Sequence, residues 1–192
     1  DGTQFTIENQ DYITPLLGYH QACNAALAID VIRQFDPNIT YNTIYNGIKK
    51  VLWPGRLQKI KKNIYYDVSH NEDGLKKTLE TINKLYTNFD IYGLFCLKND
   101  KDLLSLRDLL LKNFTNLFVA EDRNRLLINS KILSQELTKM NVRNIQVNSI
   151  KEGILILKKL VDDDSVGFIF GSHYIAEEVF NEFEISFDNY DI

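Results

Sequence analysis

The stretch YYDVSHNEDG, residues 65–74, contains the junction that decides the fold class of this 192-residue chain. Two tyrosines and a valine are typical of a strand end. Asp67, His70 and Asn71 follow, and then a glycine at the mouth of a helical pattern. A strand that passes directly into a helix is the repeating unit of α/β folds. Because the chain has only 3 histidines, the one at this junction needs an explanation.

The alternation of strand and helix patterns continues from residue 57 toward the C-terminus. Strands are predicted at 63–69, 90–97, 116–120, 144–147 and 166–171, and helices at 72–86, 102–113, 130–140, 149–161 and 173–182. Ser149 with Glu152 has the spacing of a capping box at the start of the fourth helix. Strands that alternate with helices predict an α/β fold with a mostly parallel sheet and right-handed crossovers.

Residues 1–52 have a different, mainly helical pattern. QFTI at 4–7 is strand-like, and apolar residues then recur at three- and four-residue spacing from Pro15 to Phe35. Thr40 is placed to cap a second, short helix, which Trp53-Pro54-Gly55 ends. We therefore predict a helical remnant over 1–52 and a complete α/β domain over 53–192. Since the chain begins at Asp1, we expect a piece of a longer protein.

Composition excludes several classes of function. The net charge of −4 argues against general nucleic-acid binding, while 44% hydrophobic and 25% charged residues suit a soluble globular protein. No apolar run approaches the roughly 18 residues of a membrane span, and no signal peptide is visible, so we predict a cytoplasmic protein without membrane partners. Cys23 and Cys96 lie among apolar neighbours, which predicts buried free thiols, and no cysteine spacing suggests a metal site.

Polar loops follow the predicted strands, where ligands bind in open parallel sheets. These loops are DVSHN at 67–71, KNDKD at 98–102, EDRNR at 121–125 and GSHY at 171–174. Asp67 could accept hydrogen bonds from a ribose or an ammonium group, His70 could face a phosphate or a carboxylate, and Ser172 could donate to a carboxylate. Alternatively, Asp67 and Ser172 cap helices and His70 is a surface turn residue. For His20 and His173 we expect structural roles.

Several phosphate-binding and nucleophile motifs are missing from the sequence. It contains no GxxxxGK[ST] loop, no GxGxxG after a strand, and no serine or cysteine nucleophile with a base at motif spacing. A basic cluster of six Lys/Arg runs from Lys49 to Lys62. This cluster could bind phosphate, but we expect a solvated linker, with Arg56 as the exception.

Four stretches together resemble one known family. They are GYHQACNAALAI (18–29), WPGRLQKI (53–60), IYYDVSHNEDG (64–74) with LKNDKD (97–102), and FIFGSHYIAEEV (168–179). In this order they resemble the folylpolyglutamate synthase/dihydrofolate synthase branch of the Mur ligase superfamily, over about residues 16–180. WPGR followed by D-x-x-H-N is fairly specific to that branch. The resemblance implies a Rossmann-like C-terminal domain with helices on both faces of its sheet, preceded by the end of the central ATPase domain.

The resemblance also implies a reaction and its participants. Enzymes of this branch add L-glutamate to folate or dihydropteroate with ATP and Mg²⁺, through an acyl phosphate. Their phosphate loop, magnesium ligands and carbamylated lysine lie upstream of the part that this chain resembles. We therefore expect no metal ligand here, an inactive isolated chain, and a monomer as the full-length enzyme.

Individual residues receive roles only from this resemblance. Asn24 is expected to contact the nucleotide, Arg56 to reach the ATP phosphates from a hinge, and Asp67 to contact the nucleotide at its ribose. His70 and Ser172 are expected near the incoming glutamate, in a cleft between two domains. An arginine fork suits phosphate, and a hinge position would couple domain closure to catalysis.

Two departures and two alternative functions accompany the resemblance. Glu72 replaces the usual proline after H-N, and His173 stands where the family commonly has an apolar residue.

The chain could instead be a stand-alone nucleotide- or amino-acid-binding module without catalysis, or another Mur-type amino-acid ligase, although WPGR favours the folate enzymes. Whether the product is dihydrofolate, polyglutamate or both stays open.

Overall fold

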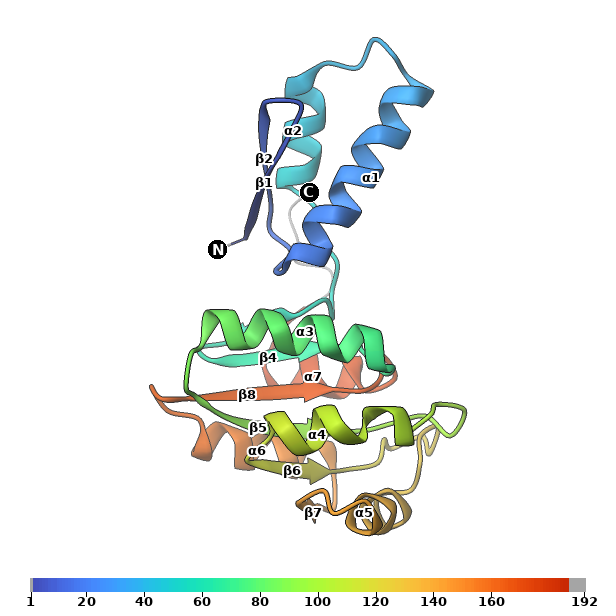
Figure 1. Ribbon diagram of the computed structural model, residues 1–192. Helices are drawn as coiled ribbons and strands as arrows, with labels where there is room; N and C mark the ends of the chain where they lie inside the picture. The colour runs from blue at the N-terminus through green and yellow to red at the C-terminus, as the bar shows by residue number, and fades with distance from the viewer. Residues whose placement is uncertain (1, 187–192) are drawn as a thin grey trace. The chain divides into compact units, whose positions relative to one another are not determined.

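The computed structural model of the chain describes residues 2–186 (Figure 1). These residues divide into two compact units, the first ending at Arg56 and the second beginning at Leu57. The predicted roles of residues 1–52 and 53–192 as parts of two enzyme domains stay predictions. Within residues 2–186, no helix is both long enough and apolar enough to cross a membrane.

The first unit consists of a β-hairpin and two helices. Its elements are β1 (Thr3–Ile7), β2 (Gln10–Thr14), α1 (Tyr19–Phe35) and α2 (Tyr41–Lys49). Thr40 caps α2 as predicted, since its side chain accepts a hydrogen bond of 3.2 Å from the Thr43 N–H. Only the first strand of the hairpin was anticipated. The second, QDYIT, was missed because Gln10 and Asp11 interrupt its apolar character, although Tyr12 is buried.

The second unit contains a six-stranded sheet in the order β3-β4-β8-β5-β6-β7. The strands are β3 (Gln58–Lys61), β4 (Ile64–Asp67), β5 (Asp90–Phe95), β6 (Asn116–Val119), β7 (Asn144–Gln146) and β8 (Ser165–Phe170). All neighbours pair in parallel except β3 and β4, which are antiparallel. This arrangement confirms the predicted fold class. The linker prediction is wrong for Gln58–Lys61, because these residues form the edge strand β3.

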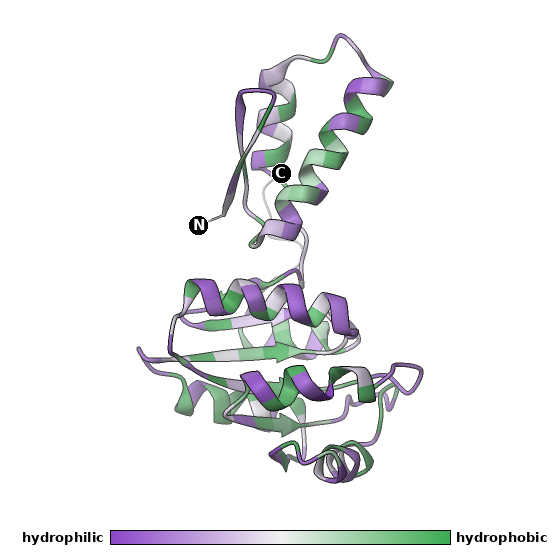
Figure 2. Cartoon of the chain, viewed as in Figure 1, coloured by the Kyte–Doolittle hydropathy of each residue, from purple (hydrophilic) through white to green (hydrophobic). Residues whose placement is uncertain are grey.

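Helices cover both faces of this sheet. They are α3 (Glu72–Leu85), the 3₁₀ turn η1 (Leu104–Leu106), α4 (Arg107–Asn113), α5 (Ser130–Lys139), α6 (Ile150–Leu160) and α7 (Ala176–Glu182). In Figure 1, α3 and α4 lie in front of the sheet and α6 and α7 lie behind it. Figure 2 shows mainly hydrophilic residues on the outward side of α3. All six residues of β8 are buried, as expected for a central parallel strand covered on both faces.

Several local predictions need correction. The helix predicted at 173–182 begins only at Ala176, because residues 171–175 form a loop after β8. The Ser149 side chain caps α6 by accepting from the Glu152 N–H at 3.1 Å. The reciprocal bond of the predicted capping box is displaced, since Glu152 Oε2 accepts from the Asn148 N–H at 2.7 Å.

The two cysteines also differ from each other. Cys96 is buried and free as predicted, and burial raises the pKa of its thiol. Cys23 was also predicted to be buried, but it is exposed. Its apolar neighbours in sequence misled the prediction, because they do not all point toward the core.

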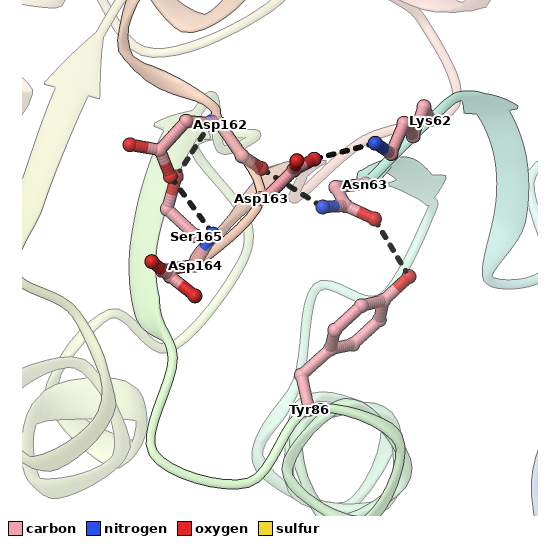
Figure 3. A network of polar contacts seen from close by, with 7 residues as sticks. All are labelled: Lys62, Asn63, Tyr86, Asp162, Asp163, Asp164 and Ser165. Atoms are coloured by element: carbon pink, nitrogen blue, oxygen red, sulfur yellow. Dashed lines mark hydrogen bonds and ion pairs between the residues drawn. The ribbon is translucent and has the colours of Figure 1, made fainter.

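A polar network ties the amino ends of β4 and β8 (Figure 3). Asn63, just before β4, donates to the Asp162 carbonyl at 2.9 Å and accepts from the Tyr86 hydroxyl at 3.3 Å. The Ser165 hydroxyl donates to Asp162 Oδ1 at 2.6 Å. Lys62 and Asp163 form an exposed ion pair beside it. The network lies at the opposite end of the strands from the loops that were predicted to bind ligand.

Candidate ligand site at the carboxyl ends of β4 and β8

The carboxyl ends of β4 and β8 form a topological switch point. The two strands are parallel neighbours, with Asp67 paired to Phe170 in register. The chain leaves β4 for α3 on one face of the sheet and leaves β8 for α7 on the other (Figure 1). The loops that follow these strands therefore diverge, and such divergence opens the usual ligand crevice of α/β sheets.

Asp67 ends β4 and holds the main chain around it. Its side chain is buried, with 4% exposed, so it faces protein more than solvent. Oδ1 accepts from the Ser69 N–H at 2.7 Å, and Oδ2 accepts from the Leu57 N–H at 2.7 Å. Leu57 has a φ of 44°, a left-handed conformation that its bond to Asp67 helps to hold. Asp67 thus joins the first residues of the second unit to the loop after β4.

His70 is half-buried in this loop, and the loop itself orients its ring. Nδ1 lies 2.9 Å from the Val68 carbonyl oxygen. Because a carbonyl can only accept, Nδ1 carries a proton, and in the neutral ring Nε2 is left as an acceptor. This bond fixes the ring orientation within the loop, and both a turn role and a ligand-binding role of His70 stay predictions.

Asn71 and Gly74 complete the transition from the loop to α3. Asn71 Oδ1 accepts from the Gly74 N–H at 2.9 Å and so caps the helix. A Cβ at Gly74 would lie 3.0 Å from Asn71 Oδ1 and 3.3 Å from Ser69 Cβ, which leaves little room for a larger residue. The helix cap that the sequence could have placed at Asp67 is therefore supplied by Asn71.

Ser172 lies in the loop after β8 and is tied to β4. It is 4% exposed, and its hydroxyl oxygen accepts from the Tyr174 N–H at 3.1 Å, which leaves its O–H able to donate. The Tyr66 hydroxyl donates to the Ser172 carbonyl at 2.9 Å. Burial raises the pKa of Tyr66, so its hydroxyl stays protonated and remains a donor.

Gly171 makes the turn between β8 and Ser172 possible. Its φ is +106°, and a Cβ at this position would lie 1.9 Å from the Cys96 carbonyl oxygen. Only glycine fits both the backbone conformation and the close approach to the strand end of β5. The glycine before Ser172 therefore has a steric reason that is independent of any ligand.

Lys98, on the loop after β5, brings a positive charge to the same edge. Its Nζ lies 3.5 Å from Asp100 Oδ2 and 5.9 Å from the centroid of the Tyr174 ring. The sequence predicts a polar loop at 98–102 but gives Lys98 no role in it. No sequence signal places Lys98 beside Tyr174, because their contact depends on β5 lying next to β8.

Asn24 and Arg56, the other two predicted site residues, lie in the first unit. Asn24 is exposed on α1, and its amide donates to Gln21 Oε1 at 3.2 Å. The half-buried Arg56 places its guanidinium 5.3 Å from the centroid of the Trp53 ring, a cation–π contact. Within the second unit the structure brings together Asp67, His70 and Ser172. Participation of Asn24 and Arg56 in the same site stays a prediction.

A metal site in a protein needs several His, Cys, Asp or Glu side chains close together. Among residues 2–186, no group of three or more His, Cys, Asp or Glu side chains could hold a metal ion. The acidic side chains of the loop after β6 are engaged in main-chain hydrogen bonds. Asp122, for example, accepts from the Leu127 N–H at 2.9 Å and from the Leu126 N–H at 3.1 Å.

Comparison with known sequences identifies relatives whose names include folylpolyglutamate synthase. No family model matches the chain. The chain is 32% identical over 111 residues to the dihydrofolate synthase/folylpolyglutamate synthase of Bacillus subtilis, a match that covers 52% of this chain and 26% of the relative. The chain therefore spans much less than the full length of the curated relatives that it matches.

Solved structures share the fold over nearly all of the chain. Mycobacterium tuberculosis folylpolyglutamate synthase complexed with ADP and AMPPCP matches with a TM-score of 0.84 at 22% identity, covering 92% of this chain and 43% of that one. A bifunctional folylpolyglutamate synthase/dihydrofolate synthase with Mn, AMPPNP and L-glutamate bound matches with a TM-score of 0.78 at 16% identity, covering 96% and 45%. The resemblance predicted from the motifs is thus confirmed, and the fold agrees with the C-terminal domain of these enzymes.

Proposed function

We propose that this chain is part of an ATP-dependent ligase that adds L-glutamate to folate or dihydropteroate. The observation that carries the proposal is the parallel pairing of β4 with β8, which places the Asp67–Asn71 loop and the Gly171–Ser172 loop at adjacent strand ends of the switch point. Both loops hold the residue types that the family motif requires, and the sequence relatives carry the name of this activity. The isolated chain, which spans a fraction of those relatives, is proposed to be inactive alone.

The reaction joins a carboxylate to an amine at the expense of ATP. The γ-phosphoryl group of ATP moves to the substrate carboxylate and gives an acyl phosphate and ADP. The amine of glutamate attacks the acyl carbon, the amide C–N bond forms, and phosphate leaves while the amine loses a proton. Catalysis of such transfers rests on positioning and charge stabilisation more than on covalent chemistry by the protein.

His70 and Ser172 are proposed to receive the incoming glutamate. With Nδ1 bound to the Val68 carbonyl, Nε2 of His70 is the ring atom that can accept a hydrogen bond from the glutamate amine and take up its proton. The Ser172 hydroxyl can donate to a glutamate carboxylate while it accepts from Tyr174. Lys98 lies close enough to Tyr174 to add positive potential to the same loop.

We propose roles in nucleotide binding for three residues, Arg56, Asn24 and Asp67. A guanidinium offers a planar fork of donors for phosphate oxygens, and stacking on Trp53 restricts its orientation beforehand. The exposed amide of Asn24 is able to contact a nucleotide. The Asp67 carboxylate is buried and accepts two hydrogen bonds from the main chain. We therefore propose that Asp67 acts mainly by positioning the loop that contacts the nucleotide, and less by a direct hydrogen bond to the ribose. The ligands of Mg²⁺ are proposed to lie upstream of the part of these enzymes that this chain resembles.

Two experiments test this proposal. The protein translated from the whole reading frame should release phosphate from ATP only when glutamate and either a folate or dihydropteroate are present. In the 192-residue chain, L-glutamate should shift the amide signals of residues 67–71 and 171–174, whereas D-glutamate should shift them less. Shifts confined to the basic cluster Lys49–Lys62 would instead indicate nonspecific anion binding and contradict the assignment.

A further inference from the structure

The carboxyl ends of the neighbouring strands β4, β8 and β5 lie level with one another. Asp67 pairs with Phe170, and Phe170 pairs in turn with Phe95, so the last residues of these strands form one row across the sheet. The Cys96 N–H joins the same strand ends by donating to the Phe170 carbonyl at 3.2 Å. The loops that follow this row therefore begin side by side, in the order of the strands.

Lys98 follows the end of β5 and reaches the loop after β8. Leu97 before it is fully buried, and the Leu97 carbonyl accepts from the Ile128 N–H at 2.8 Å, which fixes the main chain next to Lys98. The Lys98 side chain places Nζ 5.9 Å from the centroid of the Tyr174 ring. An ammonium group at this distance is attracted to an aromatic ring. Since the Tyr174 N–H donates to the Ser172 hydroxyl oxygen, the charge of Lys98 lies beside the turn that holds Ser172.

The neighbouring charges leave the Lys98 ammonium able to bind an anionic ligand. Asp100 Oδ2 lies 3.5 Å from Lys98 Nζ and 3.6 Å from Lys101 Nζ, so one carboxylate is shared between two ammonium groups. Asp102 of the same loop accepts from the Leu104 N–H at 3.0 Å. Exposed ion pairs contribute little to stability. Lys98 can therefore turn from Asp100 toward a ligand at a small cost in free energy.

The loops after β4, β8 and β5 present groups in an order that matches the functional groups of glutamate. His70 after β4 is proposed to accept from the amine, and Ser172 after β8 is proposed to donate to a carboxylate. The amine and the α-carboxylate are both attached to the α-carbon, whereas the γ-carboxylate lies at the far end of the side chain. Lys98 follows β5, the next strand beyond β8. Adjacent strands lie about 4.8 Å apart, a spacing that one glutamate side chain and the long lysine side chain together can bridge.

From this order we infer that Lys98 is a specificity-determining residue that binds the γ-carboxylate of the incoming glutamate. The inference deepens the proposed function and rests on it. The hydroxyl of Ser172 can donate to a carboxylate or to a carboxamide, so it does not distinguish glutamate from glutamine. An ammonium group carries a full positive charge and has no acceptor, so it favours the carboxylate. Lys98 thus makes the site selective for an acidic amino acid, and Ser172 orients that amino acid.

The acidic side chains at this edge of the sheet give the site a further need for a cation. Glu72 and Asp73 lie in the first turn of α3, and Glu177 and Glu178 lie in the first turn of α7. These helices follow the two loops that are proposed to receive glutamate. A ligand with two carboxylates meets unfavourable negative potential there unless a positive charge offsets it. Lys98 supplies that charge from the neighbouring loop.

The amino-acid selectivity of the protein translated from the whole reading frame tests the inference. The measured quantity is the ratio of kcat/KM for L-glutamate to kcat/KM for L-glutamine, from phosphate release at saturating ATP. In Lys98→Met this ratio should fall by about tenfold or more, because the charge that favours the γ-carboxylate is removed. The KM for L-glutamate should rise while the KM for ATP stays the same. Lys98→Arg should keep most of the selectivity, since it keeps the positive charge.

L-isoglutamine shows which carboxylate Lys98 binds, because this compound keeps the γ-carboxylate and carries an amide in place of the α-carboxylate. The ratio for L-glutamate over L-isoglutamine should be the same in Lys98→Met and in the unmodified protein. A fall in this ratio instead of the ratio over L-glutamine would assign Lys98 to the α-carboxylate and overturn the inference. Equal losses of activity with all these amino acids would show a merely structural role and would also overturn it.

Lys62→Met is the matched control. Lys62 forms an exposed ion pair with Asp163, as Lys98 does with Asp100, but it precedes β4 and so lies at the opposite end of the strands. Its selectivity ratios should equal those of the unmodified protein. The KM for L-glutamate should rise with ionic strength in the unmodified protein and in Lys62→Met, and less steeply in Lys98→Met, because salt screens the attraction between charges.

The same assay separates this inference from the proposed function. Phosphate release that depends on L-glutamate, with an unchanged ratio over L-glutamine in Lys98→Met, would overturn the inference and leave the function. An unmodified protein that releases no phosphate in response to L-glutamate would overturn the proposed function, and the inference with it.

Discussion

The hydroxyl of Tyr66 donates a hydrogen bond of 2.9 Å to the main-chain carbonyl of Ser172. The donor lies on β4 and the acceptor lies in the loop after β8, so the bond joins the strand that leads into one loop of the candidate site to the other loop. Tyr66 is fully buried, and its ring packs at 5.7 Å and nearly perpendicular to that of Phe180 on α7. The position of Ser172 therefore depends on a residue from the first parallel strand of the sheet.

Replacement of Tyr66 by phenylalanine should both destabilise the fold and weaken glutamate binding. Loss of the hydroxyl leaves the Ser172 carbonyl without this donor, at a cost of about 1–2 kcal/mol in the free energy of unfolding. Urea denaturation measures the first effect and glutamate titration the second. Tyr65→Phe is the matched control, because its hydroxyl contacts Tyr86 Oη at 2.7 Å and no residue of the Ser172 loop. Equal glutamate affinity in both variants would contradict the link.

Gly171→Ala should be among the most damaging single substitutions in the chain. The new Cβ would meet the Cys96 carbonyl oxygen at 1.9 Å and would also have to adopt a φ of +106°. We expect a loss of roughly 4 kcal/mol or more in the free energy of unfolding, measured by chemical denaturation. The control is Gly47→Ala on α2, where nothing lies within 4 Å of the added Cβ. That change should be stabilising by about 0.5–1 kcal/mol, from helix propensity alone.

His70→Ala should lower turnover of the full-length enzyme without unfolding it. If Nε2 takes up a proton from the glutamate amine, kcat/KM for glutamate should fall by about 10²–10⁴-fold. Steady-state kinetics with varied glutamate measures the effect. His173→Ala is the control, since His173 is exposed on the neighbouring loop and is not proposed to take part in the reaction. Comparable losses in the two variants would show that His70 has no special part in the reaction.

Arg56→Ala should weaken ATP-dependent turnover by about a hundredfold or more, because it removes a charged donor from the phosphates. Arg56→Lys should recover only part of the activity, since an ammonium lacks the planar fork of donors. Lys61→Ala, an exposed change in the same basic cluster, should leave the kinetics unaltered. Unchanged kinetics of Arg56→Ala would remove Arg56 from the site.

The network in Figure 3 should make stability depend on pH in the acidic range. A hydrogen bond from the Ser165 hydroxyl, with one from the Asp164 N–H, lowers the pKa of Asp162 below its ordinary value. A lowered pKa in the folded state means that the carboxylate stabilises the fold above the unfolded-state pKa and that this contribution is lost as the pH falls through the folded-state pKa. Asp162→Asn should therefore lower stability at pH 7 and flatten the pH profile below about pH 4.

The measurement for this network is the denaturant midpoint as a function of pH. Asp163→Asn serves as the control, because the Asp163 carboxylate forms an exposed ion pair with Lys62. Its midpoint at neutral pH should match that of the unmodified chain. An Asp162→Asn profile with the original slope would exclude Asp162 as the source of the acid dependence.

Local patterns in the sequence were sufficient to predict the main elements of the second unit. The five strands from 63–69 to 166–171 and the helices between them occur as predicted, with boundaries changed by a few residues. The spacing of apolar residues that predicts each element depends only on residues close together in the chain. This spacing is present in any fold that buries one face of the element. Edge elements were harder: β3 has the polar sequence QKIK, and only its pairing with β4 makes it a strand.

For the candidate site, too, the local sequence predicts some features and the fold is needed for others. Local sequence patterns are enough to predict that Asp67, His70 and Ser172 lie at or just after strand ends, because strand and turn signals lie within a few residues of each of them. The tertiary structure is needed to show that the Ser172 loop lies beside β4 and that Lys98 lies beside Tyr174. The order of strands in a sheet depends on contacts between residues far apart in the chain, such as Tyr66 and Ser172, and no local pattern encodes them.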